Sequence, residues 1–214
     1  MRVNEIFYSL QGEGFHTGRA AVFVRLSGCN LACDFCDTDH APFTEMSEEE
    51  IVSEVAQYPA TWVVMTGGEP ALQLTESLVN HLHAAGKEVA VETNGTRLLP
   101  ANVDWVTVSP KAAFVGKAGL PVLKKADEVK VVFGERPFPD DMTCDTNENR
   151  VPVSDAEVEF DPAFGIIADH YFLQPCDTGD EHRNRDITAR CIDYILQHPK
   201  WRLSLQTHKM TGIR

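Results

Sequence analysis

Short apolar runs recur along the chain, and most of them are nearly continuous rather than alternating with polar positions. Continuous apolar strands are typical of a parallel sheet that is covered on both faces. The runs that we expect to form strands cover residues 21–26, 62–66, 88–93, 105–109, 128–132, 171–174 and 202–206.

Amphipathic segments alternate with these runs. Ser47 followed by Glu50 has the pattern of a capping box, which predicts that a helix begins there. A second helix is expected from about Leu72 to Ala85, ended by Gly86, and a third from about Asp186 to Gln197. Strands alternating with helices predict an α/β fold with right-handed crossovers.

Helices are missing from some of the connections. The stretch from Glu92 to Trp105 has no helical period, and Asn94-Gly95 is typical of a turn. The segment near 134–165 is rich in proline and acidic residues, and we interpret it as an irregular insertion rather than a second domain. A complete (β/α)8 barrel needs about 250 residues. The chain has 214, so we expect one domain, 1–214, folded as a shortened, partly open barrel with fewer helices than strands.

The composition narrows the classes of function. With 19 Lys and Arg against 32 Asp and Glu the formal net charge is -13, which argues against nucleic-acid binding. We interpret the densest basic stretch as a solvated face; it contains Lys111, Lys117, Lys124, Lys125 and Lys130. Neither a membrane span nor a signal peptide is evident, so the expected location is the cytoplasm. Six cysteines in a cytoplasmic protein indicate metal binding or catalysis rather than disulfides.

Cys29, Cys33 and Cys36 have the spacing C-x3-C-x2-C directly after the first apolar run. Iron–sulfur clusters with four irons ordinarily take four cysteine ligands, so three would leave one iron open to a small molecule. A structural zinc site with His40 as its fourth ligand is the competing interpretation, and three unrelated cysteines are another. Cys144 is a weak candidate for a fourth cluster ligand.

The cysteine spacing resembles the signature of the radical S-adenosylmethionine superfamily. In that superfamily a 4Fe-4S cluster binds S-adenosylmethionine and cleaves it by one-electron reduction. Further segments resemble the superfamily's elements in the same order. They are Thr66-Gly67-Gly68-Glu69-Pro70, Ser109-Pro110-Lys111 and Gln174-Pro175-Cys176-Asp177. Each ends a predicted strand, which is where ligands lie in parallel α/β folds.

A narrower resemblance covers most of the chain. Its segments are residues 5–14, Arg25, Cys36-Asp37-Thr38-Asp39, residues 92–96 and residues 205–209. Together they resemble the family of 7-carboxy-7-deazaguanine synthases. The resemblance implies conversion of 6-carboxy-5,6,7,8-tetrahydropterin to 7-carboxy-7-deazaguanine with loss of ammonia, in the biosynthesis of queuosine and other 7-deazapurines. It also implies a homodimer and an electron donor such as flavodoxin or ferredoxin.

The resemblance assigns roles position by position. Cluster ligands are Cys29, Cys33 and Cys36, and the magnesium ligand is Thr38. Contacts with S-adenosylmethionine are Phe35, Cys36, Asp37, Gly68, Ser109, Pro110, Lys111, Gln174, Pro175, Cys176 and Asp177. Substrate contacts are Leu10, Gln11, Gly12, Arg25, Thr66 and the terminal carboxylate of Arg214.

Residue chemistry supports part of this assignment. Arg25 lies within an apolar strand, where a lone guanidinium is costly unless it meets an anion such as a substrate carboxylate. Thr38 supplies one oxygen to a metal that prefers six. The end of the chain at Arg214 either covers the pocket or frays. Asp145 and the residues after it do not form an EF-hand loop, because Arg150 replaces the required glycine.

Three rival classes remain open at this point. A glycyl-radical-enzyme activase would share the cysteine motif but needs a groove for a protein loop. A non-catalytic iron–sulfur electron carrier would need a fourth cysteine ligand. A zinc-binding interaction module would need a fourth nitrogen or sulfur ligand.

Overall fold

The computed structural model describes residues 1–36, 38–39, 42–134 and 161–213. Its centre is one nine-stranded sheet with the order β3-β1-β2-β4-β5-β6-β7-β8-β9. The strands span β1 Arg2–Leu10, β2 Ala20–Leu26, β3 Thr44–Glu45, β4 Trp62–Gly67, β5 Glu88–Thr93, β6 Trp105–Val108, β7 Lys125–Phe133, β8 Ile167–Pro175 and β9 Arg202–Leu203. From β2 to β9 every pairing is parallel, whereas β1 pairs antiparallel with β2 and β3.

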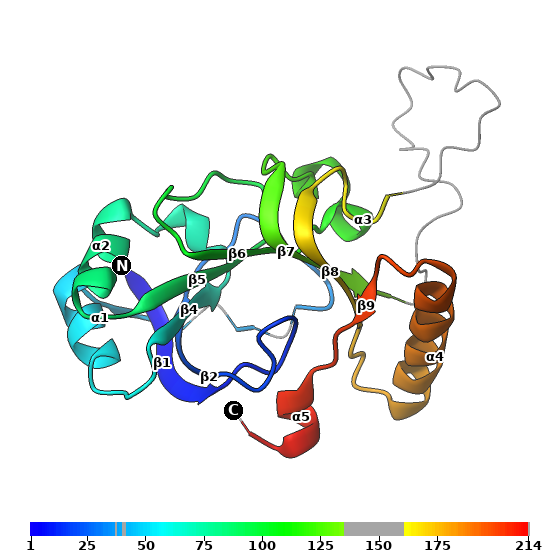
Figure 1. Ribbon diagram of the computed structural model, residues 1–214, viewed down its shortest axis with the longest axis horizontal. Helices are drawn as coiled ribbons and strands as arrows, with labels where there is room; N and C mark the ends of the chain where they lie inside the picture. Colours follow the sequence, from blue (N-terminus) through cyan, green and yellow to red (C-terminus); the bar gives the residue numbers. More distant parts are fainter. Residues whose placement is uncertain (37, 40–41, 135–160, 214) are drawn as a thin grey trace.

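Among the described residues the helices are fewer than the strands. They are α1 Glu48–Val55, α2 Glu76–Ala84, α3 Ala112–Val115, α4 Glu181–Gln197 and α5 Thr207–Thr211, with 3-10 turns η1 Pro70–Leu72 and η2 Gly116–Gly119. Figure 1 shows the sheet curving around an interior, with α1 and α2 outside one end and α4 outside the other. The sheet is open, ending in β3 and β9. The predicted shortened, partly open barrel is therefore confirmed.

Several local predictions agree with the structure in detail. Ser47 and Glu50 form the capping box at the start of α1, with hydrogen bonds in both directions. The connection between β5 and β6 contains no helix among its residues, all of which are described.

Other elements begin or end elsewhere than predicted. The first strand, β1, was not expected, because its residues mix charges and aromatics. Helix α4 starts before the expected Asp186, since Asp180 caps it by accepting the amide N–H groups of His182 and Arg183. The last strand covers only Arg202–Leu203, and α5 follows it in place of an extended tail.

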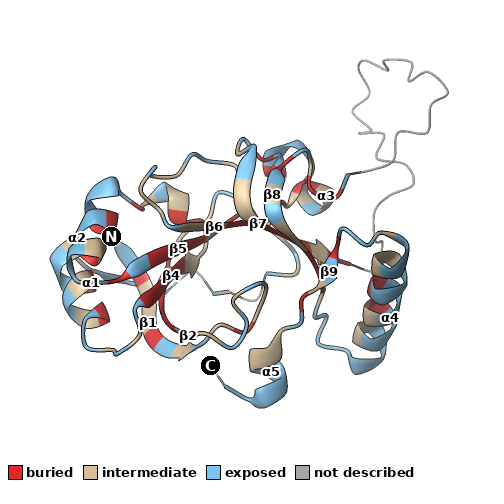
Figure 2. Ribbon diagram, in the orientation of Figure 1, coloured by how far each residue is buried: buried red, intermediate tan, exposed pale blue. Residues whose placement is uncertain are grey.

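Two apolar clusters hold the sheet to its helices. One joins β2, β4 and β5 to α1 and α2, and includes Ile51, Met65 and Leu82. The other joins β7 and β8 to α4, and includes Phe133 and Ile187. Figure 2 shows buried residues concentrated in the strands and on the sheet-facing sides of these helices. Because the outer face of the sheet is covered in this way, the inner face is left for the site.

Hydrogen bonds between distant loops span the open side of the barrel. Thr207 donates both its amide N–H and its hydroxyl to the Gly12 carbonyl oxygen at 2.9 Å. The Gly14 amide donates to Ser204 Oγ at 3.0 Å. The loop after β1 is thereby fastened to the segment after β9, and this closes the ring where the sheet does not.

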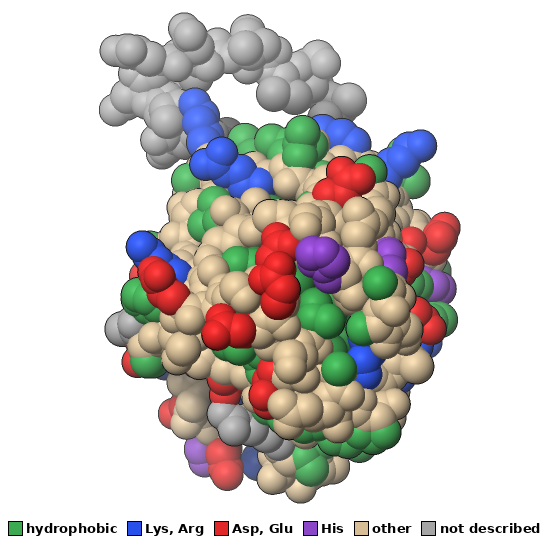
Figure 3. Space-filling model, turned by 90° about the vertical axis from the view of Figure 1, so that its left-hand side faces the viewer, with side chains coloured by type: hydrophobic (Ala, Val, Ile, Leu, Met, Phe, Trp, Pro, Cys, Tyr) green, Lys and Arg blue, Asp and Glu red, His purple; other side chains and the backbone are tan. Residues whose placement is uncertain are grey.

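The outer surface is mixed in chemistry. On the face drawn in Figure 3, acidic, apolar and uncharged side chains are interspersed, and most of the basic side chains lie near its upper edge. Among the described residues, no helix is both long enough and apolar enough to cross a membrane.

Candidate functional site

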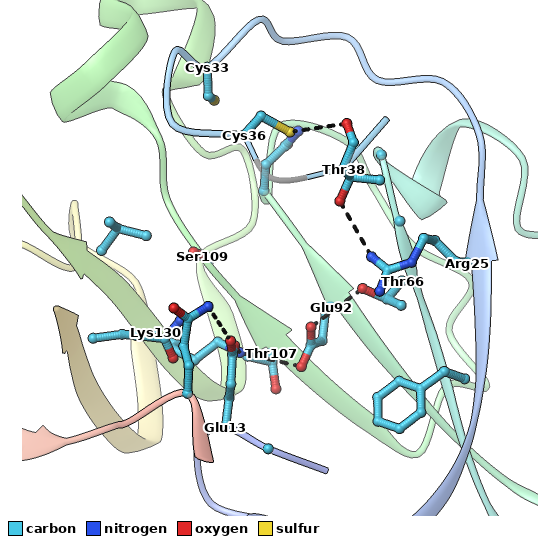
Figure 4. A pocket seen from close by; sticks show the side chains of 18 of the residues that line it. Glu13, Arg25, Cys33, Cys36, Thr38, Thr66, Glu92, Thr107, Ser109 and Lys130 are labelled. Atoms are coloured by element: carbon cyan, nitrogen blue, oxygen red, sulfur yellow. Dashed lines mark hydrogen bonds and ion pairs between the residues drawn. The ribbon is translucent and has the colours of Figure 1, made fainter. Parts of the chain in front are cut away.

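A cavity of about 540 Å³ opens in the interior of the barrel. That size is ordinary for a site that binds a small molecule or cofactor. Its lining comes from the strand ends, the cysteine loop, the loop after β1 and the segment that leads into α5. Figure 4 shows Cys33 and Cys36 on one side of this space and the side chains of Glu13 and Lys130 on the other.

Most of the residues assigned from the sequence line this one cavity. Those that do so are Leu10, Gln11, Gly12, Arg25, Cys29, Cys33, Phe35, Cys36, Thr38, Thr66, Gly68, Ser109, Lys111, Gln174, Pro175, Cys176 and Asp177. Pro110 is buried and lies outside the lining. Several residues considered in the sequence lie outside the described residues: Asp37, His40, Cys144, the rejected calcium loop at 145–156 and Arg214.

The loop after β2 carries the three thiols of the cysteine motif. None is in a disulfide; Cys29 and Cys33 are half-buried, and Cys36 is exposed. Burial raises the pKa of Cys29 and of Cys33 above the ordinary value. Cys36 Sγ donates to the Thr38 carbonyl oxygen at 3.8 Å. Three unlinked thiols facing one cavity are a donor set that suits an iron–sulfur cluster.

The end of β4 is packed closely against this loop. The Gly68 amide donates to the Leu26 carbonyl oxygen at 3.0 Å, and the Glu69 amide donates to the Gly28 carbonyl oxygen at 2.9 Å. A Cβ on Gly68 would overlap the Gly28 carbonyl group. Gly67 has φ +114°, which favours glycine. Glycine is therefore required here for the backbone to pass the cysteine loop.

Glu69, next in the same motif, has a structural role in this protein. Its carboxylate is fully buried and accepts hydrogen bonds from Thr93 Oγ1 at 2.6 Å and from the Asn94 amide at 2.7 Å. It also accepts from the Ala71 amide at 3.0 Å. A buried carboxylate needs such partners, and through them Glu69 fixes the ends of β4 and β5 relative to each other.

Arg25 extends from β2 into the cavity, where it already has an anionic partner. Its Nε donates to Glu5 Oε1 at 2.9 Å, and its Nη1 donates to Thr38 Oγ1 at 3.4 Å. The sequence argument required an anion beside this guanidinium, and Glu5 of the neighbouring strand supplies one. The two strands pair so that Arg25 lies opposite Glu5.

An ionic network lies deeper in the cavity. Lys130 Nζ is 2.5 Å from Glu13 Oε2 and 3.3 Å from Glu92 Oε1. Glu92 also accepts from Gln11 Nε2 at 2.8 Å and from Thr66 Oγ1 at 3.4 Å. Burial alone would raise the pKa of Glu13, but Lys130 outweighs burial and lowers that pKa to about 2.

The interpretation of the lysine-rich stretch as a solvated face is wrong for two of its members. Lys130 is 5% exposed, and Lys111 also lines the cavity. Lys111 Nζ donates to the Ser109 carbonyl oxygen at 2.7 Å and to Ser109 Oγ at 2.6 Å. Burial lowers the pKa of Lys111 to about 8. Lys130 faces inward because the alternation of side chains along β7 sets its direction, and Lys111 lies in the turn between β6 and α3.

The sequence reasoning gave no role to Glu13, Glu92 or Lys130, although a signal was present. Glu92 and Lys130 are charged residues at alternating positions inside apolar strands, as Arg25 is. A charged side chain at such a position needs a partner or a ligand, and this holds for Arg25, Glu92 and Lys130 alike. His208 also lines the cavity against Gly12, where a Cβ would overlap its ring.

The described residues contain no group of three or more His, Cys, Asp or Glu side chains placed to hold a metal ion. His40, the fourth ligand in the zinc interpretation, lies outside the described residues.

Comparison with known proteins gives a consistent result. The sequence model of the radical SAM superfamily matches residues 23–116. A 7-carboxy-7-deazaguanine synthase of Bacteroides thetaiotaomicron is 47% identical over 213 residues, which cover 100% of this chain and 98% of that protein. The 7-carboxy-7-deazaguanine synthase of Bradyrhizobium diazoefficiens is 40% identical, and the match covers 99% of this chain and 98% of that protein.

A solved structure supports the same relationship. The crystal structure of QueE from Escherichia coli superposes with a TM-score of 0.67 at 27% sequence identity, covering 95% of this chain and 92% of that one. The relatives give no support to the glycyl-radical activase or the electron carrier.

Proposed function

The chain belongs to the family of 7-carboxy-7-deazaguanine synthases, and on this premise we propose that it converts 6-carboxy-5,6,7,8-tetrahydropterin to 7-carboxy-7-deazaguanine with loss of ammonia. The observation that carries the proposal is the convergence of the cysteine motif, Arg25 and the Glu13–Lys130–Glu92 network on one cavity. The substrate has a carboxylate at one end and N–H donors at the other. The cavity has the Arg25 guanidinium on one wall and the carboxylates of Glu13 and Glu92 on another, so the two match.

The cysteine loop would hold the cluster at one side of the cavity. Cys29, Cys33 and Cys36 supply three thiolates, and membership of the radical SAM superfamily implies both a 4Fe-4S cluster and S-adenosylmethionine. When bound, the pair supplies one-electron cleavage of S-adenosylmethionine, which starts radical chemistry on the substrate. The glycines at the end of β4 let the backbone pass close to the cysteine loop, and by the resemblance this element would contact the methionine portion.

Two further strand ends would bind the rest of S-adenosylmethionine. Ser109 and Lys111 follow β6, whereas Gln174 and Pro175 end β8 and are followed by Cys176 and Asp177. Asp177 is held in place by Lys209 at 2.8 Å, by the Gly179 amide and by Asn184, which together lower its pKa to about 2. We assign Phe35, Asp37, Gly68 and Cys176 to the same pocket on the resemblance alone.

The substrate would lie between Arg25 and the ionic network. Arg25 can bind a carboxylate through two parallel N–H groups, an arrangement that fixes orientation as well as affinity. Gln11 offers an amide that donates and accepts. Leu10, Gly12, Thr66 and the terminal carboxylate of Arg214 complete the proposed substrate contacts.

Magnesium is proposed beside Arg25. Thr38 lines the cavity and supplies one hydroxyl oxygen, while Mg²⁺ prefers six oxygens and retains waters. The substrate carboxylate would therefore complete the site, and binding would depend on substrate. Turnover should rise with added magnesium, and Thr38→Ala should blunt that rise while leaving S-adenosylmethionine cleavage intact. Equal turnover with and without a chelator would count against the ion.

We further propose a homodimer that takes electrons from flavodoxin or ferredoxin in the cytoplasm. None of the described cysteines is in a disulfide, which suits a reducing compartment. Light scattering on the reconstituted protein measures the subunit number, and a mass equal to one chain would reject the dimer.

The decisive experiment is an anaerobic incubation of reconstituted protein with reductant, S-adenosylmethionine and 6-carboxy-5,6,7,8-tetrahydropterin. Mass spectrometry should detect 7-carboxy-7-deazaguanine, together with ammonia release. Cys36→Ala is the control and should give neither, because the cluster lacks a ligand. A protein that carries four irons and cleaves S-adenosylmethionine but leaves the pterin unchanged would refute the proposed substrate.

A further inference from the structure

Lys130 is a buried ammonium group for which no contact with substrate or cofactor has been proposed above. It lies on β7 two residues after Glu128, so both side chains point into the barrel. Its side chain is 7% exposed, and it lines the cavity beside Glu13 and Glu92. An ammonium group this deep is costly unless it is paired and hydrogen-bonded.

The lysine joins two carboxylates that come from opposite parts of the barrel. Glu13 lies in the loop after β1, and Glu92 lies on β5. Lys130 Nζ reaches both, at 2.5 Å and 3.3 Å. Figure 4 shows the Glu13 and Lys130 side chains directed at each other, with Glu92 beyond them in the same space. The position of each carboxylate therefore depends on the same ammonium group.

The remaining bonds of the two carboxylates leave them with acceptor capacity. Glu13 Oε1 accepts from Gln206 Nε2 at 3.0 Å. Glu92 accepts from Gln11 and Thr66. A carboxylate has about four acceptor positions, so each can accept further N–H groups from a ligand in the cavity.

Charge balance at this end of the cavity also depends on Lys130. The charged and titratable groups that face it or its partners are Glu13, Glu92, Glu128, Lys111 and His208. Burial raises the pKa of Glu128 to about 7. Burial would also raise the pKa of Glu13, and it is chiefly Lys130 that prevents this. Without the ammonium group, the wall would hold buried carboxyl groups that favour the protonated form.

We propose that Lys130 is a positioning residue that holds the carboxylates of Glu13 and Glu92 at one wall of the cavity, so that they accept the N–H groups of an amino-pyrimidine ring. The inference rests on the proposed function, because it deepens the recognition of that substrate. If Lys130 acts in this way, the enzyme selects its substrate by the amino group on the pyrimidine ring. A protonated carboxyl group would instead place its O–H donor opposite an N–H donor of the ligand.

Binding of pterin, compared with lumazine, tests this role without turnover. Lumazine has a carbonyl group where pterin has the amino group. Affinities would be measured by calorimetry on the reconstituted protein with S-adenosylmethionine and no reductant, at pH 5 and pH 7. The unsubstituted protein should prefer pterin at least tenfold, with a similar preference at both pH values.

Lys130→Met should weaken pterin binding at least tenfold at pH 5, and part of the affinity should return at pH 7 as Glu13 ionises. The preference over lumazine should fall toward one. Lys130→Arg, which keeps the charge, should retain most of the preference. Lys125→Met removes an exposed lysine from the same strand and is the matched control. His208 is present in every variant, so the ratio of affinities between variants at one pH cancels its contribution.

A purely structural lysine would lower the melting temperature of Lys130→Met without changing the pterin preference or its pH dependence, and that result would overturn the proposal. If the Met variant does not fold, Lys130→Gln takes its place. The ¹³C carboxyl signal of Glu13, assigned with Glu13→Gln, gives an independent reading: in the unsubstituted protein it should not titrate between pH 4 and pH 7. Titration near pH 4.3, the ordinary value for glutamate, would also overturn the proposal.

These outcomes are separable from a failure of the proposed function. An enzyme that turns over the carboxylated pterin yet binds lumazine as well as pterin rejects the role of Lys130 alone. Absence of turnover with an unperturbed preference for pterin rejects the reaction and keeps the recognition.

Discussion

Glu128 shares the inner face of β7 with Lys130, and its carboxylate accepts the Phe15 amide at 3.1 Å. Burial raises its pKa to about 7, above the 4.5 of a free glutamate. The folded protein thus binds this proton more tightly than the unfolded chain does. By linkage, the contribution of Glu128 to stability is fully present below pH 4.5 and is lost as the pH rises through 7.

The change Glu128→Gln should therefore stabilise the protein more at high pH than at low pH. Glutamine cannot ionise, so the difference in unfolding free energy between variant and parent should grow from pH 5 to pH 8, by up to about 3 kcal/mol. Urea unfolding at the two pH values measures it. Glu45→Gln, on an exposed edge strand, is the control and should show no such growth. A constant difference would mean that Glu128 ionises normally.

At the cysteine loop, replacement of Cys29, Cys33 or Cys36 by Ala should abolish iron binding, because each thiolate would hold one iron. Iron analysis and the visible spectrum after anaerobic reconstitution measure the loss. Cys144→Ala should keep the iron. Cys176→Ser is a second control, since it lines the same cavity without belonging to the motif. Loss of the cluster in either control would show that a fourth cysteine binds iron.

At the residue scale, residue spacing predicted those parts of the site whose members lie close together in the sequence. The cysteine motif and the glycines after β4 could be found because their members are neighbours in sequence. The partners Glu5–Arg25 and Glu13–Lys130 could not, since each pair joins different strands or loops whose contact is set by register. The sequence shows that a buried charge needs a partner, but only the fold shows which partner it has.

At the scale of elements, α5 is the unexpected feature that bears most directly on the site. The sequence predicted an extended final segment through Gln206, but β9 ends at Leu203. The Ser204 amide still donates to the Leu173 carbonyl oxygen of β8, while its hydroxyl bonds to Gly14 and Gln174. The short helix that follows has no strong apolar period, so no pattern could indicate it. Helix α5 is fastened to the loop after β1 through Gly12 and to the loop after β8 through the pair Lys209–Asp177.

A tag appended to the C-terminus should therefore impair the substrate site. The added chain would displace the residues after α5 and, on the proposed assignment, remove the free carboxylate of Arg214. We expect KM for the pterin to rise at least tenfold, which corresponds to about 1.4 kcal/mol, while the melting temperature and iron content stay nearly unchanged. Steady-state kinetics measure the effect.

The control for that experiment is the same tag at the N-terminus. It would disturb the bond from the Met1 ammonium group to the Met46 carbonyl oxygen at 2.6 Å, but not α5. If the C-terminally tagged enzyme has the KM of the N-terminally tagged one, then Arg214 has no part in substrate binding.

At the scale of the whole molecule, the sheet connects two apolar clusters that share no residue. The cluster under α1 and α2 lies at one end, and the cluster under α4 lies at the other. The parallel pairing between β5, β6 and β7 joins them, as do the bonds across the open side. Apolar periodicity predicted the strands of both clusters, but the closure between Gly12 and Thr207 depends on loop geometry that no periodicity encodes.

The chain should accordingly unfold as one domain, and paired core substitutions test this. Ile51 and Ile187 are 0% and 1% exposed in the two clusters. Replacement of either by Ala should cost about 2–5 kcal/mol and lower the melting temperature by roughly 5–15 °C.

Trp201 reports on the α4 cluster, and Trp62 lies in the separate inner cluster of β4 and its neighbours. Because the sheet is continuous, Ile51→Ala should shift the Trp201 fluorescence transition as far as the circular dichroism transition, and Ile187→Ala should shift the Trp62 transition likewise. Variants with a single remaining tryptophan separate the signals. If Ile187→Ala moved only the Trp201 transition and left the Trp62 transition in place, the two ends would be separate folding units, and the single-domain description would be wrong.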